Sequence, residues 1–308
     1  MPDYTLRQLE YFVAVADAGS VTGAAAAVHL SQSAMSTALA ALERSLGVQL
    51  IVRRHARGVT LTPAGAAFLV EARALLAQAS DLGQLAAHLG GSVAGDFTLG
   101  VFAVVAPYVV PDLLEGASTR LPAVELRTAE EALDGLLAGL RTGRFELALG
   151  YDLLADPDVE VEVLAEVAPH VLLPAGHPLA GRRRVSLRAL ADEPLVLLDL
   201  PHSREYFARL FAASGVSPRV RHRTLSAELA RALVARGGCY TVLNLRPRVD
   251  LSIDGSPYAV VPLDVPLPRE ESSLHLSLLR LVGSRRTHKA HAVAELCRTL
   301  PLASTPSK

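Results

Sequence analysis

The sequence predicts a multidomain protein with a small, mainly helical N-terminal domain, one long helix and a larger C-terminal α/β domain. Three patterns support this fold class. Short helical segments fill most of the first 62 residues, a heptad repeat runs from residue 68 to residue 89, and strand and helix patterns alternate from residue 97 onward. A chain of 308 residues is also long enough to form more than one domain with a sizeable core.

Two short helices joined by a tight turn are predicted between Ser20 and Gly47. Ser20 and Ser31 stand where N-caps belong, and Gly47 suits a left-handed helix end. The second helix carries one apolar stripe, at Met35, Leu39, Leu42 and Leu46. Its other face carries small or uncharged side chains, at Gln32, Ser33, Ser36 and Thr37. Such a face can lie in the major groove of DNA, although an ordinary helical hairpin would show the same pattern.

A third helix is predicted from Thr5 to Ala18, and it must share one core with the other two because none of them can bury its apolar stripe alone. Apolar residues alternate at 48–52 and again at 59–61, which predicts a two-stranded wing. Three arginines lie at its tip, namely Arg53, Arg54 and Arg57. Beside a groove-sized helix these cations are expected to pair with DNA phosphates, while a solvated hairpin is the alternative. Residues 1–62 are therefore interpreted as a winged helix-turn-helix domain.

A long helix is predicted to start at Thr62-Pro63, where threonine suits the N-cap and proline the first helical position. Apolar residues follow at alternating spacings of four and three as far as Leu89. Such a heptad seam needs a partner, and a second copy of the chain is the simplest one; packing against its own domain is the alternative. The residues expected to pair two chains are Phe68, Leu75, Leu82 and Leu89. Gly90-Gly91-Ser92 is expected to end the helix in a flexible joint.

The remainder of the chain predicts an α/β domain with a largely parallel sheet. Strands are expected at 97–102, 124–127, 147–150, 170–173, 195–198, 220–224, 240–245 and 275–280. Helices are expected at 108–119, 131–141, 204–213, 227–236 and 287–300.

Composition argues against several other classes of protein. The formal net charge is −1, so no overall basic field points to nucleic acid. Cys239 and Cys297 lie far apart in the sequence and indicate neither a disulfide framework nor a metal site, which fits a cytoplasmic protein. The N-terminus lacks the pattern of a signal peptide, and no apolar run is long enough to span a membrane.

Signatures of catalysis are missing as well. The sequence has no G-x-S-x-G elbow, no H-E-x-x-H, no paired C-x-x-C and no Gly-Lys of a phosphate loop. Asp199, His202 and Ser203 crowd into one strand-to-helix turn, where a base cannot easily line up behind a nucleophile. We therefore expect no catalytic residue, no metal ligand and no cofactor. The same turn could contact an anionic ligand at a helix N-terminus, or it could serve only as a capping turn.

Several motifs lie in register along the first ninety residues: Leu6-Arg7-Gln8-Leu9, Phe12, Gly19-Ser20, the alanines at 24–27, Ser31-Gln32-Ser33, Ser36, Leu42-Glu43, Leu46-Gly47, Leu50 and Thr60-Leu61-Thr62-Pro63-Ala64-Gly65. Together they resemble the DNA-binding part of a LysR-type transcriptional regulator. The rest of the chain resembles that family's effector domain, two α/β lobes around a cleft as in a periplasmic binding protein. The resemblance implies a DNA-binding domain at 1–62, a linker or dimerisation helix with a hinge at 63–91 and an effector-binding domain at 92–308. Lobe I would span about 92–162 and 266–302, and lobe II about 163–265.

The resemblance also implies a function and its partners. The chain is expected to bind double-stranded promoter DNA as a homodimer or a dimer of dimers, and to respond to a small-molecule effector between the lobes. The expected effector contacts are Phe102, Ala103, Val104, Thr128, Leu200, His202, Ser203, Thr224, Ser226 and Asn244. Because the loop after the first strand is apolar here, we expect a ligand with a larger apolar part. The alternative is a metabolic enzyme or solute-binding protein with an accessory helical domain, although an enzyme needs neither wing nor linker helix.

Overall fold

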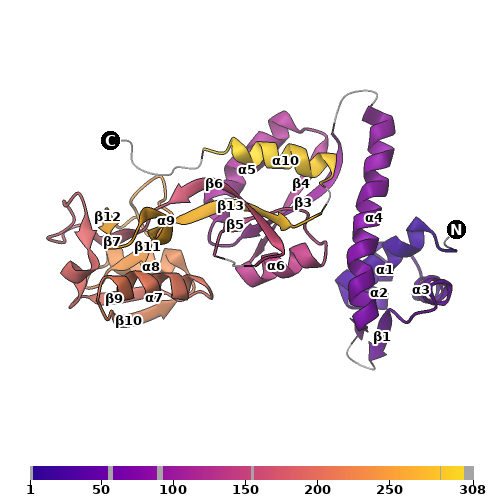
Figure 1. Ribbon diagram of the computed structural model, residues 1–308, viewed down its shortest axis with the longest axis horizontal. Helices are drawn as coiled ribbons and strands as arrows, with labels where there is room; N and C mark the ends of the chain where they lie inside the picture. The colour runs from indigo at the N-terminus through magenta and orange to yellow at the C-terminus, as the bar shows by residue number, and fades with distance from the viewer. Residues whose placement is uncertain (1–2, 55–57, 89–92, 154–155, 285, 302–308) are drawn as a thin grey trace.

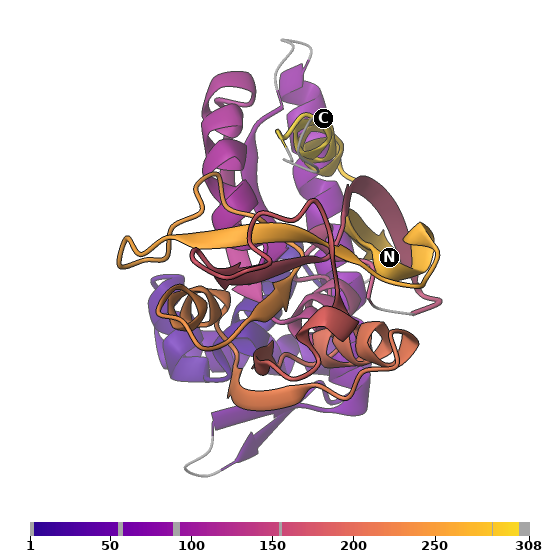
Figure 2. The same cartoon turned by 90° about the vertical axis from the view of Figure 1, so that its left-hand side faces the viewer.

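The computed structural model describes residues 3–54, 58–88, 93–153, 156–284 and 286–301. Figure 1 shows a small helical domain, the long helix α4 packed along it, and an α/β domain divided into two lobes. Figure 2 views the molecule from the end that carries the second lobe, with the N-terminal domain behind. No helix within the described ranges is long and apolar enough to cross a membrane.

Three helices build the N-terminal domain: α1 (Leu6–Ala18), α2 (Val21–Ala27) and α3 (Gln32–Leu46). Each starts at a hydroxyl side chain that accepts a hydrogen bond from an N–H of the first turn, provided by Thr5, Ser20 and Ser31 in turn. The apolar faces meet in one core, whose centre is fully buried at Leu9, Phe12, Met35, Leu39 and Leu42. The predicted three-helix unit is therefore confirmed.

The wing consists of strands β1 (Ile51–Arg54) and β2 (Gly58–Leu61), which pair in antiparallel fashion. Glu43 ties the wing to α3, because its Oε1 accepts hydrogen bonds from the backbone N–H groups of Leu50 at 2.7 Å and Ile51 at 3.0 Å. Gly58 has a φ of 79°, and a Cβ there would lie 2.4 Å from the carbonyl oxygen of Gly19. Glycine is therefore required where the wing meets the end of α1.

Helix α4 (Pro63–His88) starts where the Thr62 hydroxyl accepts from the Gly65 N–H at 2.9 Å. Its first turns pack against the N-terminal domain, since Phe68 lies 5.6 Å from Phe12 between ring centroids and Ala72 is buried in the same core. At these positions the helix uses its own domain as the partner. Leu75 is 40% exposed and faces away from that core. The Leu82 side chain, all of Leu89 and the predicted joint at residues 90–92 lie outside the described residues.

Lobe I contains a five-stranded sheet in the order β4-β3-β5-β13-β6. Its strands are β3 (Gly95–Phe102), β4 (Val124–Glu131), β5 (Ala148–Tyr151), β6 (Val159–Val167) and β13 (Leu274–Leu281). Strand β3 runs parallel to β4 and β5, whereas β13 runs antiparallel to both β5 and β6. The helices of this lobe are α5 (Ala106–Arg120), α6 (Leu133–Arg141) and α10 (His288–Arg298).

Lobe II contains a four-stranded sheet in the order β11-β7-β12-β8 and the parallel pair β10-β9. Its strands are β7 (His170–Pro174), β8 (Val185–Ser186), β9 (Pro194–Leu198), β10 (Arg219–Thr224), β11 (Thr241–Leu243) and β12 (Tyr258–Asp264). Its helical elements are η1 (Leu187–Leu190), α7 (Ser203–Ala213) and α8 (Ala227–Ala235). Helix α9 (Arg269–Ser272) leads from lobe II back to β13.

The prediction of a largely parallel sheet is wrong, and three strands of the α/β domain were not predicted. Both lobes have mixed sheets rather than largely parallel ones, because β13 and β7 each pair antiparallel with two neighbours. Strands β6, β8 and β12 were not expected. Valine and glutamate alternate along the start of β6, which is a strand signal, whereas β12 carries Pro262 and β8 has two residues. The expected helix at 131–141 begins later, because β4 continues to Glu131.

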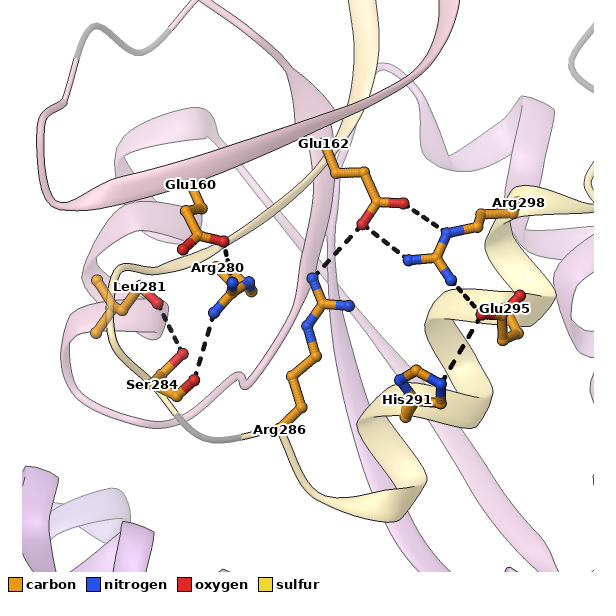
Figure 3. Close-up of polar contacts among 9 residues, drawn as sticks. All are labelled: Glu160, Glu162, Arg280, Leu281, Ser284, Arg286, His291, Glu295 and Arg298. Atoms are coloured by element: carbon orange, nitrogen blue, oxygen red, sulfur yellow. Dashed lines mark hydrogen bonds and ion pairs between the residues drawn. The ribbon is translucent and has the colours of Figure 1, made fainter.

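Charged side chains tie the edge strand β6 to the C-terminal helix α10 (Figure 3). Glu162 accepts two hydrogen bonds from Arg298, at 2.5 and 2.9 Å, and lies 3.5 Å from Arg286. The hydrogen bonds from Arg298 keep the pKa of Glu162 below its ordinary value. Glu160, two residues earlier on the same strand, pairs with Arg280 of β13. Strand β6 is thereby held at its place in the sheet by carboxylates on alternate residues.

Arg73 of α4 connects the N-terminal domain to lobe I. Its guanidinium pairs with Asp17 of α1 and donates a hydrogen bond to the carbonyl oxygen of Thr142, at the end of α6. Its side chain is 11% exposed, and a Cβ on the neighbouring Gly143 would lie 3.3 Å from it. Arg73 therefore joins the N-terminal domain to the C-terminal end of α6.

Candidate functional site

The first turns of α3 form a polar surface on the N-terminal domain. Gln32, Ser33 and Thr37 are exposed and Ser36 is half-buried, while Met35 on the other face is fully buried. The Thr37 hydroxyl donates to the Ser33 carbonyl at 2.9 Å, and the Ser33 hydroxyl lies 3.0 Å from that of Ser31. These side chains remain short, uncharged and directed to solvent, so a flat or grooved partner could approach the helix closely.

The wing is fixed to the C-terminal half of α3, because Glu43 accepts hydrogen bonds from the start of its first strand. The backbones of Arg53 and Arg54 pair with Val59 and Gly58 in the register of the hairpin. Their side chains, and all of Arg57, lie outside the described residues. The structure thus describes the backbones of two wing arginines on the strand whose first residue, Ile51, is fixed to α3.

Three of the predicted effector contacts meet in a narrow space between the lobes. Val104 from lobe I faces Ser203 and Asn244 from lobe II, together with Tyr108 and Phe207. The space measures about 20 Å³, which holds roughly one water molecule. Ser203 is 5% exposed, and its hydroxyl makes no hydrogen bond to any of the described residues. Its hydroxyl can therefore donate to or accept from a ligand that enters this space.

Other predicted contacts have structural partners. The Thr224 hydroxyl accepts from the Ser226 N–H at 3.0 Å, and the Ser226 hydroxyl caps α8 by accepting from Leu229 N–H at 3.2 Å. Phe102 is 3% exposed and packs edge-on against Tyr151 in the core of lobe I. Ala103 is exposed, and Thr128 and Leu200 are half-buried.

His202 and two other residues of lobe II reach across to lobe I. Its Nε2 lies 2.8 Å from Oδ1 of Asp134, near the start of α6. His202 has a φ of 62°, an uncommon backbone conformation for a residue other than glycine. Arg248 donates to Asp112 at 2.8 Å, and Arg231 donates to the Tyr108 hydroxyl. These three contacts join the lobes, and Arg231 and Tyr108 also line the narrow space.

Arg231 and Tyr108 were not singled out from the sequence. The Arg231 side chain is 2% exposed, although it carries a full charge. Its burial could have been predicted from its position on α8. Arg231 follows Ala227 by four residues and precedes the buried Val234 by three, so all three lie on one face of the helix. Burial raises the pKa of Tyr108 to about 12, so its hydroxyl is protonated and accepts the hydrogen bond from Arg231 as a neutral group.

The described residues hold no cluster suited to a metal ion, and both cysteines are free and buried. Burial raises the pKa of Cys239, and it raises the pKa of Cys297 to about 12. Buried thiols with a raised pKa carry little thiolate, which is the reactive form.

Two family models match the chain. Residues 6–66 match the bacterial regulatory helix-turn-helix protein, lysR family, and residues 90–301 match the LysR substrate binding domain. A "Probable hydrogen peroxide-inducible genes activator" of Mycobacterium avium is 37% identical over 274 residues, covering 87% of this chain and 88% of that protein.

Solved structures show the same likeness. HinK, a LysR family transcriptional regulator from Pseudomonas aeruginosa, is 37% identical with a TM-score of 0.63, covering 96% of this chain and 98% of that one. A full-length OxyR variant from the same organism is 25% identical with a TM-score of 0.75, covering 97% of this chain and 99% of that one.

The buried His170, which feels the charge of Arg231, should make the free energy of unfolding sensitive to acid. Burial, together with the positive charges of Arg231 and Arg246, lowers the pKa of His170 to about 3. The unfolded chain binds the proton near pH 6.5, so stability is complete above that value and falls as the pH falls towards 3. Between pH 7 and pH 5 the loss should be about 2 kcal/mol.

Urea unfolding at both pH values measures this loss. His170→Gln should remove most of the acid sensitivity, whereas His222→Gln, at an exposed histidine, should keep it. An equal loss in the parent and in His170→Gln would show that other groups cause the acid sensitivity.

Proposed function

The chain belongs to the LysR family of DNA-binding transcriptional regulators, and on that premise we propose that it binds operator DNA as a homo-oligomer whose DNA affinity is set by a small molecule between the two lobes. The matched family consists of transcription regulators rather than enzymes, so the enzyme alternative is set aside. The observation that carries the proposal is the exposed, uncharged start of α3 together with an antiparallel wing whose sequence is rich in arginine.

We propose that residues 1–62 bind DNA, that residues 63–91 pair two chains and transmit the signal, and that residues 92–308 bind the effector. Within the effector domain, lobe I would span about 92–162 and 266–302, and lobe II about 163–265. In this division Gln32, Ser33, Ser36 and Thr37 face the major groove. Arg53, Arg54 and Arg57 meet the flanking phosphates. Base contacts then decide the sequence, and phosphate contacts decide the register and most of the affinity.

The effector is proposed to enter the space between the lobes, where it meets the hydroxyl of Ser203 and the apolar side chains of Val104 and Phe207. Since that space now holds roughly one water molecule, the lobes must part to admit a ligand. The contacts His202–Asp134 and Arg248–Asp112 each have one exposed member, so separating them costs little.

The names of the curated relatives suggest hydrogen peroxide as the signal. A thiolate sensor of peroxide would need a reactive cysteine, and the chain has two cysteines. Both are buried and have a raised pKa. We therefore infer that this chain responds to a bound molecule rather than through oxidation of a thiolate.

The wing assignment is tested by the salt dependence of DNA binding. Arg54→Ala should weaken binding to all sequences and lower the slope of log affinity against log salt by about one unit, because one phosphate contact is lost. Gln32→Ala should instead change which sequences are preferred. Arg182→Ala removes the same charge from an exposed position in lobe II and should leave the slope unchanged. A parental slope for Arg54→Ala would exclude the wing from the DNA interface.

The pairing of two chains through α4 is tested at Leu75, which is exposed in the single chain. Leu75→Asp would bury a charge in the seam and should convert the oligomer to smaller species in light scattering. Ala74→Asp adds the same charge about a quarter turn away and should leave the mass unchanged. The same mass for the parent and for Leu75→Asp would rule out this seam.

The effector site is tested by thermal-shift titration with a panel from small dicarboxylates to aromatic acids. A ligand that binds the folded state stabilises it by about 2.7 kcal/mol at one hundred times its Kd. Ser203→Ala should reduce the shift, whereas Ser214→Ala, at a buried serine that donates within α7, should not. Footprinting of upstream DNA with the same compounds connects binding to regulation. Equal shifts in both variants would remove Ser203 from the site.

A further inference from the structure

Lobe II carries a surplus of positive charge that the contacts proposed so far do not use. Residues 163–265 contain thirteen arginines and nine carboxylates, whereas the whole chain has a formal net charge of −1. Three of these arginines, Arg219, Arg221 and Arg223, alternate along β10, and all three are exposed. Such a local difference in charge indicates a surface for an anionic partner.

Strand β10 is an edge of lobe II. Among the described residues its one strand partner is β9, so its other side pairs with no strand in that part of the chain. The arginines from residue 219 to residue 223 span roughly 13 Å, at about 3.3 Å per residue. Charged side chains discourage an edge strand from pairing with a strand of another protein, so a polyanion fits this edge better than an extended peptide does.

The arginines of β10 are incompletely neutralised. Asp199 pairs with Arg204 at 2.5 Å and with Arg223 at 3.2 Å, so one carboxylate serves two guanidinium groups. Arg221 donates to a backbone carbonyl at 3.3 Å, which carries no net charge. Within the described residues Arg219 has no hydrogen-bonding or ionic partner for its side chain. The edge therefore keeps free N–H donors and net positive charge.

Strand β10 and the wing lie on the same side of the molecule (Figures 1 and 2). In both views the wing is at the lower end of the N-terminal domain, and β10 forms the lower rim of lobe II. The longest axis of the molecule is horizontal in Figure 1 and separates the two. A duplex that leaves the wing along this lower side would therefore continue towards β10.

We propose that the exposed arginines of β10 bind the phosphate backbone of DNA that flanks the operator, as a second contact besides α3 and the wing. Guanidinium groups bind phosphate oxygens through paired N–H donors, and such contacts add affinity without reading the sequence. The inference rests on the proposed function and adds a DNA contact in lobe II. It predicts that affinity depends on the length of the DNA as well as on the operator.

Binding of the full chain to two fragments that share one footprinted operator tests the proposal, one of about 25 and the other of about 70 base pairs. The parent should bind the long fragment about fivefold more tightly, because the second contact adds to the first. Its salt slope on the long fragment should be steeper by about two units, for two further phosphates. The double variant Arg219→Gln/Arg221→Gln should lose both differences. Hydroxyl-radical footprinting should show protection in the flank for the parent and none for the variant.

The matched control is the double variant Arg182→Gln/Arg183→Gln. It removes the same charge from exposed positions just before β8, which is the other edge strand of lobe II, and should behave as the parent does. Equal affinity of the parent for both fragments, or a parental length dependence in the β10 variant, would overturn the proposal. An equal loss in the control would also overturn it, since the effect would then come from the net charge alone.

The short fragment separates this inference from the proposed function. If Arg54→Ala keeps the parental slope on the short fragment while the β10 variant loses protection of the flank, the wing assignment falls and this inference stands. If Arg54→Ala lowers the slope while the β10 variant binds the long fragment as the parent does, the wing assignment stands and this inference falls.

Discussion

Lobe II is inserted between β6 and β13, so the chain crosses between the lobes twice, and one buried hydrogen-bonded pair holds both crossings. The Tyr206 hydroxyl donates to the Ser272 carbonyl at 2.7 Å, close to the second crossing. Asn244 donates from Nδ2 to the Val167 carbonyl at 3.0 Å, at the first crossing, and to the Tyr206 oxygen at 2.8 Å. Burial raises the pKa of Tyr206 well above its ordinary value, so the hydroxyl keeps its proton. The space between the lobes depends on this network, because the network fixes the two points at which the chain leaves lobe I and returns to it.

The N-terminal domain and helix α4 could be predicted in detail because their signals are local. Caps at Ser20 and Ser31, the stripe of α3 and the threonine-proline start of α4 are each contained within a few residues. The close approach of Gly58 to Gly19 could not be predicted, since it depends on how the wing folds back on α1. The seam of α4 was ambiguous for the same reason: Ala72 fits a partner helix and its own domain equally well as a pattern, and only packing distinguishes them.

In the α/β domain the alternation of strands and helices could be predicted, but the order and direction of the strands in the sheets could not. Strand β13 pairs with β5 and β6, which precede it by more than a hundred residues, and nothing near β13 in the sequence encodes that pairing. Arg231 could not be singled out from the sequence for the same reason. Arg231 is significant only because Tyr108, from the other lobe, accepts its hydrogen bond. Asn244 was expected to contact a ligand, but its two amide hydrogens are already used within the protein.

Helix α6 makes one contact at each end with a different part of the molecule. Asp134 in its first turn meets His202 of lobe II, and the carbonyl of Thr142 at its other end meets Arg73, which also holds Asp17 of the N-terminal domain. The helix has nine residues, so these two contacts are separated by roughly 13 Å of rigid rod. A hydrogen bond is lost when its atoms separate by a few tenths of an ångström beyond their normal range. A shift of α6 along its axis would therefore change two contacts at once. One is the contact between the lobes at His202, and the other is the contact with the DNA-binding domain at Arg73.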